Sequence, residues 1–267
     1  MSGLLDAVRS ATVFDLAQPY FPGMPHFPTH PPFLFGLTKK HGDLVTDGGV
    51  SSSADALALG SHVGTHIDAL CHFSCGGKLY GGIDVKSMQS DTTGIQRYSV
   101  DTIAPILRRG VLLDIATHLN MEALPADFAI TPDHLDAVVE AQNVSIGRGD
   151  VVLLRTGWAR FWSNASRFIT GGKGTVATCP GPELDAARWL SSKGIFAAGS
   201  DTVAFERVPA TEMPVHVHLL VENGIHIIEC LNLEELARRR VFDFVFMATP
   251  LKIRGATGSP IRPLALA

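Results

Sequence analysis

The chain has 267 residues and a formal net charge of −4, from 22 basic and 26 acidic side chains, and hydrophobic residues make up 46% of it. So small a charge, with no basic stripe interleaved with aromatic residues, argues against a nucleic-acid partner. No run approaches the roughly 20 apolar residues that cross a bilayer, and the start, MSGLLDAVRSATVFDL, lacks the pattern of a secretory signal, so we expect a cytoplasmic protein without a membrane partner.

The first hundred residues contain few helical patterns and one proline-rich segment. Residues 18–33, QPYFPGMPHFPTHPPF, include six prolines, which exclude a helix and disfavour a central strand. Because the segment is also rich in Phe and His, it differs from a flexible linker. We expect a loop packed over a surface or over the mouth of a site.

The chain contains four cysteines, which are too few for a disulfide framework in a protein of this length. Cys71 and Cys75 alone suggest a zinc pair, but such a pair is usually spaced more tightly and accompanied by a second pair. The sequence offers no second pair. We therefore interpret all four as small buried thiols: Cys71, Cys75, Cys179 and Cys230.

From residue 100 onwards, short apolar runs alternate with helical patterns. Runs of strand length occur at residues 110–116, 150–157, 195–200, 225–231 and 241–248. Helices are predicted at residues 131–144, 181–194, 215–224 and 232–237. Thr131 and Pro132 are typical of a helix start, and Gly194 is typical of a helix end. Asn232 and Glu235 have the spacing of a capping box.

This alternation predicts an α/β fold with a central mixed sheet flanked by helices. The less helical first hundred residues would add a β-rich portion. We find no internal repeat, no low-complexity tract and no change of composition that marks a boundary. We therefore expect a single domain over residues 1–267.

The stretch 61–73, SHVGTHIDALCHF, gathers potential metal ligands. Its three histidines and one aspartate all have even numbers, so an extended chain places them on one face: His62, His66, Asp68 and His72. A helix would turn two pairs about 150° apart, and a flat strand would separate His62 from His66 by about 13 Å, whereas ligands of one ion lie within about 4 Å of each other. An extended segment bent at Gly64 satisfies both limits. We therefore predict a metal site rather than scattered histidines.

Two residues of the C-terminal half are candidates to complete the ligand shell. Glu229 lies in the apolar run 225–231, where a carboxylate is strongly disfavoured unless it is paired or bound to metal, so it is the best distal ligand candidate. An edge position facing water is the alternative. His216 shares a helix face with Leu219 and Leu220 and should point inward, either as a ligand or as a buried histidine bonded to the backbone.

These residues also match a known pattern. Residues 62–73, His-Val-Gly-Thr-His-Ile-Asp-Ala-Leu-Cys-His-Phe, resemble the signature His-x-Gly-Thr-His-x-Asp-x-Pro-x-His-Phe of the metal-dependent hydrolase family called cyclase, which includes bacterial kynurenine formamidase and isatin hydrolase. Similar segments elsewhere are DLAQPYFPGMP, GVLLDIA, GDVVLLRTGW, GSDTVAFE, PVHVHLLVENGIHIIECLNLEEL and GSPIRPLA, so the resemblance covers nearly the whole chain. It implies the swivelling β/β/α fold of that family.

The resemblance implies a role for each matching residue. The first two histidines and the aspartate would bind a divalent metal, and the last histidine would be the general base: His62, His66, Asp68 and His72 in that order. The family's later Pro-Val-His and Glu fall on His216 and Glu229, which would complete one or two metal sites. The segment between these two residues is one residue longer than the family pattern.

The implied activity is metal-assisted hydrolysis of an amide or lactam C–N bond in a small aromatic substrate, with His72 as general base. The ligand mix suits Mn²⁺ or Zn²⁺, one or two per subunit, and the family implies a homo-oligomer, either dimer or tetramer. Phe27 is a candidate substrate contact, although its loop could equally pack against the core or another subunit. The alternatives are lactone hydrolysis, polyketide-type cyclisation or dehydration at the same metal site, and a non-catalytic metal-binding protein of this fold.

Overall fold

A nine-stranded mixed sheet forms the frame of the molecule in the computed structural model, which describes residues 2–172 and 174–267. In spatial order the strands are β1 (Val13–Asp15), β15 (Leu264–Leu266), β13 (Asp243–Ala248), β7 (Ile106–Asp114), β9 (Val151–Arg155), β11 (Ala197–Ser200), β12 (His226–Glu229), β4 (His66–Asp68) and β14 (Gly258–Pro260). The four central strands, β7 to β12, run parallel. The strands on both sides of them pair antiparallel.

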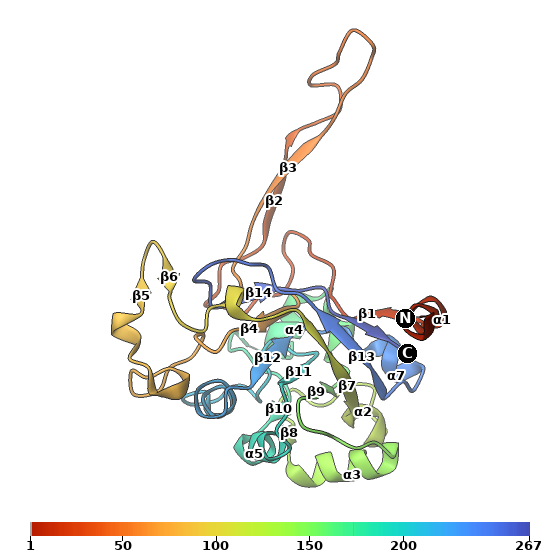
Figure 1. Cartoon of the computed structure of the whole chain (residues 1–267), viewed down its shortest axis with the longest axis vertical. Coiled ribbons are helices and arrows are strands. Elements are labelled where there is room, and N and C mark those ends of the chain that lie inside the picture. Colours follow the sequence, from red (N-terminus) through yellow and green to blue (C-terminus); the bar gives the residue numbers. More distant parts are fainter. Residues whose placement is uncertain (1, 173) are drawn as a thin grey trace.

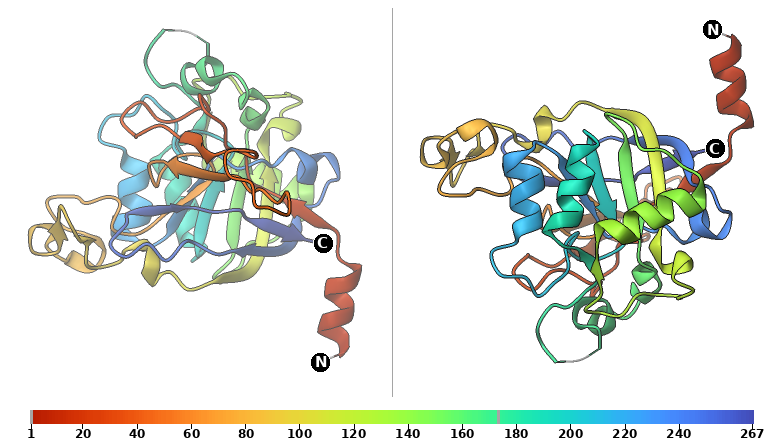
Figure 2. Two further views of the ribbon diagram at one scale, coloured as in Figure 1. Left: turned by 90° about the horizontal axis from the view of Figure 1, so that it is seen from above. Right: turned by 90° about the horizontal axis from the view of Figure 1, so that it is seen from below.

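Helices cover one face of this sheet, as the right panel of Figure 2 shows. They are α3 (Pro132–Gln142), α5 (Leu184–Ser192), α6 (Pro214–His216) and the π-helix η5 (Val217–Glu222). Their apolar side chains share a core with the central strands, in which Leu135, Leu190 and Leu219 lie. On its other face the sheet curls around a second core, which contains Ile67 and Phe246. The predicted α/β fold with a mixed sheet flanked by helices is therefore confirmed.

The remaining elements are short. They are the helices α1 (Ser2–Ser10), α2 (Ile115–His118), α4 (Ala165–Thr170) and α7 (Glu234–Arg238), the strand pairs β8 (Ala129–Ile130) with β10 (Gly181–Pro182) and β5 (Gln89–Ser90) with β6 (Gly94–Ile95), and the 3₁₀ turns η1 (Tyr80–Gly82), η2 (Val85–Ser87), η3 (Val100–Thr102) and η4 (Trp158–Phe161). None of the helices in the described residues is long and apolar enough to cross a membrane. Residues 18–33 contain no helix or strand, which confirms the predicted loop.

The start and end signals in the sequence were partly correct. Thr131 is the N-cap of α3, where its hydroxyl accepts a hydrogen bond from the His134 backbone, and Pro132 is the first helical residue. Gly194 follows α5 with a positive φ of 68°, as a helix end requires. The five predicted strands are confirmed as β7, β9, β11, β12 and β13, although β7 ends at Asp114 because α2 begins at the next residue.

One prediction near the C-terminus was wrong. The capping box does not form, because Leu233 is the N-cap of α7 and Asn232 Oδ1 accepts a hydrogen bond from the Glu234 N–H at 3.4 Å. Glu235 turns instead to Arg238 and Arg239, which it pairs with at 2.6 and 2.9 Å. After β13 the chain adds two further strands to the sheet, β14 and β15. Neither was predicted, because both are short and show no alternation of apolar and polar residues.

The segment between His216 and Glu229, which is one residue longer than the pattern that the resemblance implies, contains a π-helix. The helix that begins at Pro214 changes at Val217 into η5, whose hydrogen bonds close over five residues instead of four. Such a turn holds more residues than an α-helical turn, so the longer segment ends at Gly224 without displacing its flanks. His216 Nε2 still lies 3.1 Å from Glu229 Oε1.

A long hairpin, which we call the arm (residues 34–58), stands out from the body of the molecule (Figure 1). Its paired strands are β2 (Leu34–Lys39) and β3 (Ala54–Ala58), and they are exposed along nearly their whole length. The arm joins two segments that carry predicted site residues. Phe27 lies shortly before β2, and His62 lies four residues after the end of β3.

Candidate metal centre

The backbone around Gly64 gives the metal motif its shape. Gly64 has a positive φ of 71°, and the chain turns there before entering β4. A side chain at this position would collide with the ring of Tyr20, whose hydroxyl donates to the carbonyl oxygens of Val63 and Thr65 at 3.0 Å each. The predicted bend at Gly64 is therefore present, and it is held by an aromatic ring that packs directly on the glycine.

Strand β4 brings the motif to the distal ligand. It lies between β12 and β14, and its antiparallel register sets His66 opposite Glu229. Residues directly opposite each other in such a pair have neighbouring side chains. Accordingly, His66 Nε2 lies 3.4 Å from Glu229 Oε2, and Glu229 is buried, not at an edge facing water. The sheet thus joins two ligand candidates that are far apart in sequence.

All five predicted metal ligands meet in one buried cluster. Asp68 Oδ1 lies 2.7 Å from His62 Nδ1 and 3.5 Å from His66 Nε2. His216, which points inward as its helix face predicted, places Nε2 3.1 Å from Glu229 Oε1 and 4.0 Å from Asp68 Oδ2. Each of these residues is more than nine-tenths buried. Their roles as ligands stay predictions, but the structure places all of them together.

The cluster fits a divalent cation. Two triads, each with ligand atoms within 4.8 Å of one another, share Asp68: His62, Asp68 and His72, and Asp68, His216 and Glu229. Asp68 Oδ2 is buried without a hydrogen-bond partner among the described residues, so one acceptor in the middle of the cluster is free. Imidazole nitrogens together with carboxylate oxygens suit a divalent transition metal. These donors would suffice for one ion or for two.

The electrostatics of the cluster favour a bound cation. Burial opposes ionisation of Asp68, but the surrounding histidines outweigh it and hold the pKa of this carboxyl well below its usual range. For Glu229, burial is likewise outweighed by hydrogen bonds from His216 and His66, which lower its pKa to about 2. Both carboxylates are therefore anionic at neutral pH. Two buried negative charges close together need positive charge beside them, which the neighbouring histidines provide here and which a bound metal ion would also supply.

His72 lies on the turn that follows β4. Its ring stacks on that of His62, with the ring centres 3.8 Å apart, and meets the edge of Phe73 at 4.9 Å. Burial lowers the pKa of His72 to about 3, so its imidazole is neutral at physiological pH. Because His72 belongs to one of the two triads, its position is compatible with metal binding as well as with proton transfer, and its role as base stays a prediction.

Glu206 supports the centre and was missed from the sequence. Its Oε1 accepts hydrogen bonds from His216, from the backbone N–H at 2.9 Å and from Nδ1 at 2.6 Å. This contact leaves Nε2 of His216 directed at Glu229, which is how a second carboxylate commonly orients a metal-bound histidine. The sequence feature that could have identified Glu206 is a carboxylate in the apolar segment TVAFE. Nothing in the spacing of that segment linked Glu206 to His216.

A cavity of about 280 Å³ opens beside the cluster. Phe27 lines it, as does Phe73, and His72, His216 and Glu229 face it from the metal side. His30, which the sequence analysis did not single out, also lines it and holds the carbonyl of His62 with Nδ1 at 3.3 Å. The structure thus places Phe27 in the lining of this cavity, on the loop of residues 18–33.

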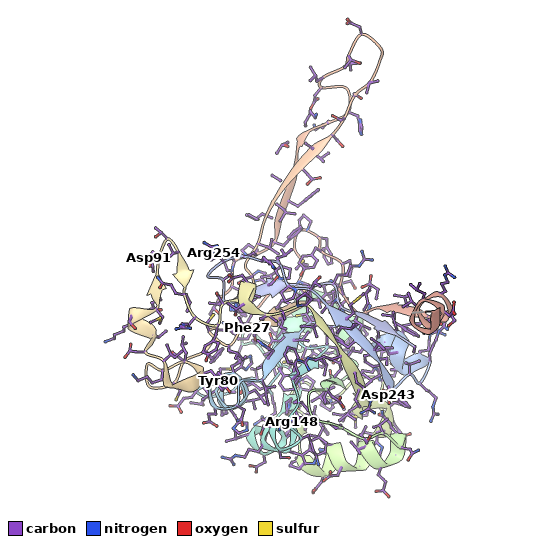
Figure 3. All side chains as sticks on the ribbon, in the orientation of Figure 1. Phe27, Tyr80, Asp91, Arg148, Asp243 and Arg254 are labelled. Atoms are coloured by element: carbon purple, nitrogen blue, oxygen red, sulfur yellow. The ribbon has the colours of Figure 1, made fainter. Side chains whose placement is uncertain are left out.

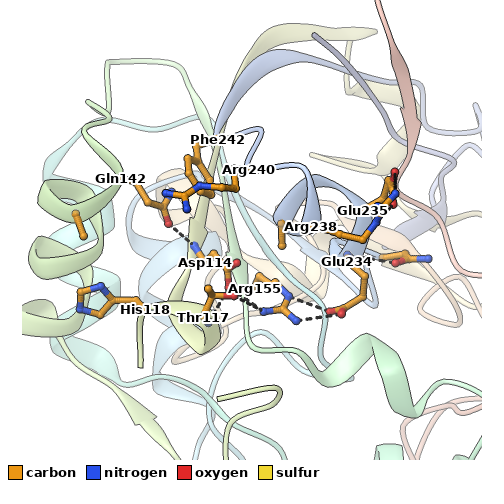
Figure 4. Close-up of a pocket in the computed structure, with 13 residues that line it drawn as sticks. Asp114, Thr117, His118, Gln142, Arg155, Glu234, Glu235, Arg238, Arg240 and Phe242 are labelled. Atoms are coloured by element: carbon orange, nitrogen blue, oxygen red, sulfur yellow. Dashed lines mark hydrogen bonds and ion pairs between the residues drawn. The ribbon is translucent and has the colours of Figure 1, made fainter. Parts of the chain in front are cut away.

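A second, larger hollow of about 820 Å³ lies elsewhere, around Arg155 (Figure 4). The guanidinium of Arg155 is paired with Asp114 at 2.9 Å and with Glu234 at 2.9 and 3.0 Å, and it also donates to Thr117. These acceptors occupy the N–H groups of Arg155. The Arg155 side chain therefore links α2, β9 and α7, and its charge is already paired and is not free to bind a ligand.

The GSDT segment after β11 has a supporting role. Asp201 accepts hydrogen bonds from the backbone N–H and hydroxyl of Thr156 at 2.9 and 2.7 Å and from the N–H of Trp158 at 3.0 Å. Ser200 pairs with Thr202. These hydrogen bonds give the segment the role of a turn after β11.

Comparisons with known proteins agree with this geometry. The model of the Cyclase family, described as "Putative cyclase", matches residues 14–207. The isatin hydrolase of Roseibium aggregatum is 32% identical over 214 residues, which are 79% of this chain and 73% of that protein. The kynurenine formamidase of Bacillus cereus is 26% identical over 261 residues, which are 96% of this chain and 97% of that protein. The solved structure of isatin hydrolase A from Ralstonia solanacearum aligns with 100% of this chain and 96% of its own, with 26% identity and a TM-score of 0.78.

The curled mixed sheet and the buried histidine–carboxylate cluster define a hydrolytic enzyme of the α/β class with a candidate metal centre. The chain belongs to the cyclase family, because the family match covers well over half of its length. The resemblance that the His62–Phe73 motif indicated is confirmed. The isatin hydrolase and the kynurenine formamidase are proteins that this chain is similar to.

Proposed function

We propose that this protein is a metal-dependent hydrolase that cleaves an amide or lactam C–N bond in a small aromatic substrate. The observation that carries the proposal is one buried cluster of metal-ligand candidates, of which His216 and Glu229 line a cavity together with His72. The names of the relatives, an isatin hydrolase and kynurenine formamidases, support a C–N bond that is not a peptide bond. The greater identity to the isatin hydrolase favours a cyclic amide.

The cavity has the features that such a substrate requires. Phe27 and Phe73 provide apolar walls for an aromatic ring, and the metal-side residues face the opposite end. A volume of about 280 Å³ is at the small end for a ligand site, which suits a compound of one or two rings. We propose Phe27 as a substrate contact on this ground.

The chemistry follows from the residues at the floor. A divalent ion, Mn²⁺ or Zn²⁺, held by His62, His66, Asp68, His216 and Glu229 at one or two positions, would supply a Lewis acid and lower the pKa of a coordinated water. His72 accepts a proton from the attacking water as a C–O bond forms, and returns a proton to the nitrogen as the C–N bond breaks. The products are a carboxylate and an amine. Burial keeps the His72 ring uncharged at neutral pH.

The proposal is tested with a panel of N-formyl arylamines, aromatic lactams and lactones, each assayed with metal-loaded and chelator-treated protein. We expect turnover of amides or lactams that disappears on chelation and returns when Mn²⁺ or Zn²⁺ is added back. Full activity after complete removal of metal would refute the metal mechanism. Turnover of lactones alone, or formation of a cyclised or dehydrated product, would favour the alternative chemistry at this centre.

The role of His72 is tested with His72→Ala. We expect turnover to fall about 10²- to 10⁴-fold, the usual contribution of a general base, while the metal content of the purified protein stays the same. His218→Ala is the matched control, because His218 lies on the helix of His216 but bonds to Glu222 and Ser191 away from the cluster. Unchanged turnover would show that the base is another group, and loss of metal would make His72 a ligand.

A further inference from the structure

His30 lines the cavity beside the metal cluster, yet it has no part in the proposed chemistry. It belongs to neither of the two triads of metal-ligand candidates. Its ring centre lies 5.2 Å from that of His62 and 6.3 Å from that of His72. It also lies 5.9 Å from the ring centre of Phe27, which forms an apolar wall of the cavity. The imidazole of His30 is therefore close both to this wall and to the metal side.

A turn over residues 27–30 holds the imidazole of His30 and the ring of Phe27 together. The backbone N–H of His30 donates to the carbonyl oxygen of Phe27 at 2.9 Å. Pro28 occupies the second position of this four-residue turn, where its fixed φ favours the turn. Phe27 lies in the body of the molecule, below the base of the arm (Figure 3). The sequence thus sets an aromatic ring and a polar side chain at the two ends of one turn.

The hydrogen bonds of His30 decide which of its ring nitrogens is free. Nδ1 lies 3.3 Å from the carbonyl oxygen of His62. A carbonyl oxygen only accepts, so Nδ1 must carry the hydrogen, and the neutral imidazole, which has a single N–H, then has a lone pair on Nε2. Within residues 2–172 and 174–267, no group forms a hydrogen bond with Nε2. This acceptor is therefore the polar atom that His30 can offer to a bound molecule.

The other polar groups that line the cavity have different partners or roles. Glu229 lies 3.1 Å from His216, and both belong to the metal cluster. His72 serves proton transfer in the proposed reaction. Thr29 is exposed, so water competes for its hydroxyl group. An N–H group of a molecule in this cavity therefore finds a free and partly buried acceptor in His30.

The proposed substrate class carries a matching donor at the bond that breaks. The nitrogen of a secondary amide or of an unsubstituted lactam has an N–H, whereas a lactone oxygen and an N-alkylated amide have none. Two imidazoles whose centres are 6.3 Å apart can both reach one substrate nitrogen, because hydrogen bonds are about 2.9 Å long. His72 can then give its proton to the lone pair of this nitrogen while His30 holds the N–H.

We propose that His30 is a specificity-determining residue whose Nε2 accepts a hydrogen bond from the N–H of the scissile amide or lactam, an inference that rests on the proposed function. This contact selects C–N bonds that carry an N–H over lactones and over N-alkylated amides. His30 moves no proton in this role. Its position is fixed before the substrate binds, by the turn from Phe27 and by the hydrogen bond to the His62 carbonyl.

The size of the selectivity follows from one hydrogen bond. A substrate without an N–H leaves Nε2 of His30 desolvated and unpaired, and losing one such neutral hydrogen bond corresponds to a factor of about 5 to 30 in kcat/KM. The N–H is present both in the bound substrate and during the attack on the carbonyl carbon. Binding of this kind is uniform along the reaction, so the selectivity should appear in KM rather than in kcat.

The test compares isatin with N-methylisatin, two aromatic lactams with the same ring system that differ at the N–H. Formanilide and N-methylformanilide are the equivalent pair if the enzyme cleaves only acyclic amides. At pH 8, where an ordinary imidazole is neutral, we expect metal-loaded wild type to prefer the N–H compound. The preference should fall about 5- to 30-fold in His30→Phe, which keeps a ring without an acceptor, through a higher KM for the N–H compound. His30→Gln, whose carboxamide oxygen reaches about as far as Nε2, should keep most of it.

His26→Phe is the matched control, because His26 lies in the same loop, bonds to the carbonyl oxygen of Phe27 and is not among the described residues that line the cavity. Its preference for the N–H compound should equal that of the wild type. The metal content of all the variants, measured on the purified proteins, should also stay the same.

The possible outcomes separate this role of His30 from the proposed function. If His30→Phe lowers kcat/KM equally for both members of the pair, His30 only supports the backbone at His62, and the inference is overturned while the proposed function stands. A fall of 100-fold or more in kcat for both members would make His30 a proton-transfer group, which also overturns it. If metal-loaded wild type cleaves neither N–H compound, the proposed function itself fails, and the role of His30 fails with it.

Discussion

At the scale of single residues, the centre depends on Asp68. Its Oδ1 contacts His62 and His66, and its Oδ2 is directed toward His216 without a hydrogen-bond partner among the described residues. A buried acceptor without a partner raises the free energy of the folded state, and a bound cation removes that penalty. Metal binding should therefore be coupled to stability through this side chain more than through any of the histidines.

Asp68→Asn is expected to uncouple stability from metal. At a free metal concentration 100 times its dissociation constant, mass action raises the free energy of unfolding of the wild type by about 2.7 kcal/mol, and Asp68→Asn should show no such increase. Thermal unfolding with and without Mn²⁺ or Zn²⁺ measures this difference. Asp84→Asn, an exposed aspartate, is the control and should respond like the wild type. An undiminished response of Asp68→Asn would remove Asp68 from the ligand set.

Glu206→Gln tests the support of His216. The amide keeps the shape of the side chain but loses the charge that holds Nδ1 of His216, so we expect metal affinity to fall by about 10- to 100-fold. Isothermal titration of the metal-free protein measures the change. Glu212→Gln serves as control, because Glu212 is exposed in the same loop. Equal affinities in Glu206→Gln and wild type would mean that the contact does not orient the ligand.

At the scale of secondary structure, the position of β4 explains why the motif works. The three residues of β4, held between β12 and β14, set His66 and Asp68 beside Glu229. The turns before and after β4 bring His62 and His72 to the same cluster. The turn before the strand depends on Gly64, because Tyr20 fills the space that a side chain would occupy.

Gly64→Ala and Gly82→Ala separate backbone strain from this close contact. Both glycines have positive φ, of 71° and 76°, but an added methyl group meets nothing within 4 Å at Gly82 and meets the ring of Tyr20 at Gly64. Gly82→Ala should cost about 1 kcal/mol in the free energy of unfolding. We expect Gly64→Ala to cost clearly more and also to lower the metal content. Equal denaturation midpoints for the two variants would contradict the contact.

Site residues could be predicted from the sequence when they lie close together along the chain or carry a local signal of their own. His62, His66, Asp68 and His72 were recognisable because even spacing within one segment limits the geometry to a single bend. Glu229 was recognisable because a carboxylate in an apolar strand needs a partner. Glu206 also lies in an apolar context, but nothing in the sequence linked it to His216 or linked His30 to His62, since only the tertiary fold brings these residues together.

The same limit applies to the elements. Helix α3 was predicted from its cap, and the parallel strands from their apolar runs, because these signals are local. The order of strands in the sheet was not predictable, since the register of β4 against β12 is a pairing between segments about 160 residues apart for which no local rule exists. The short strands β14 and β15 owe their structure to their neighbours rather than to their own residues.

At the scale of the whole molecule, the apolar clusters bury most of the thiols: Cys71 lies in the core with Ile67 and Phe246, and Cys179 and Cys230 lie in a third cluster. Cys71, Cys179 and Cys230 are buried, as predicted, whereas Cys75 is exposed, which corrects that part of the interpretation. Burial raises the pKa of Cys71 and of Cys179 to about 12, and that of Cys230 well above its usual value. Because the thiolate is the reactive form, these three thiols stay protonated and inert at physiological pH.

Alkylation should therefore modify one thiol of the native protein. We expect iodoacetamide at pH 8 to label Cys75 alone, and raising the pH to 9 to leave the other three unlabelled, since both pH values lie below their raised pKa values. Mass spectrometry of the intact protein counts the labels. Cys75→Ser should give none, and unfolded protein should give four. A second label on the native protein would show that one of the cores opens on the time scale of the reaction.

The two chain segments at the base of the arm, at Pro31 and Gly60, lie close together. This closeness affects how members of this family can diverge. A side chain at Gly60 would lie 3.0 Å from the ring of Pro31. The segments that enter and leave the arm therefore lie against each other just before the metal motif begins. Lengthening a loop whose ends already meet costs only about 0.6 kcal/mol per doubling. Insertions, deletions or wholesale replacement of residues in the arm would leave Phe27 and His62 in place. The length of the arm can thus vary, or be engineered, without displacing the metal motif.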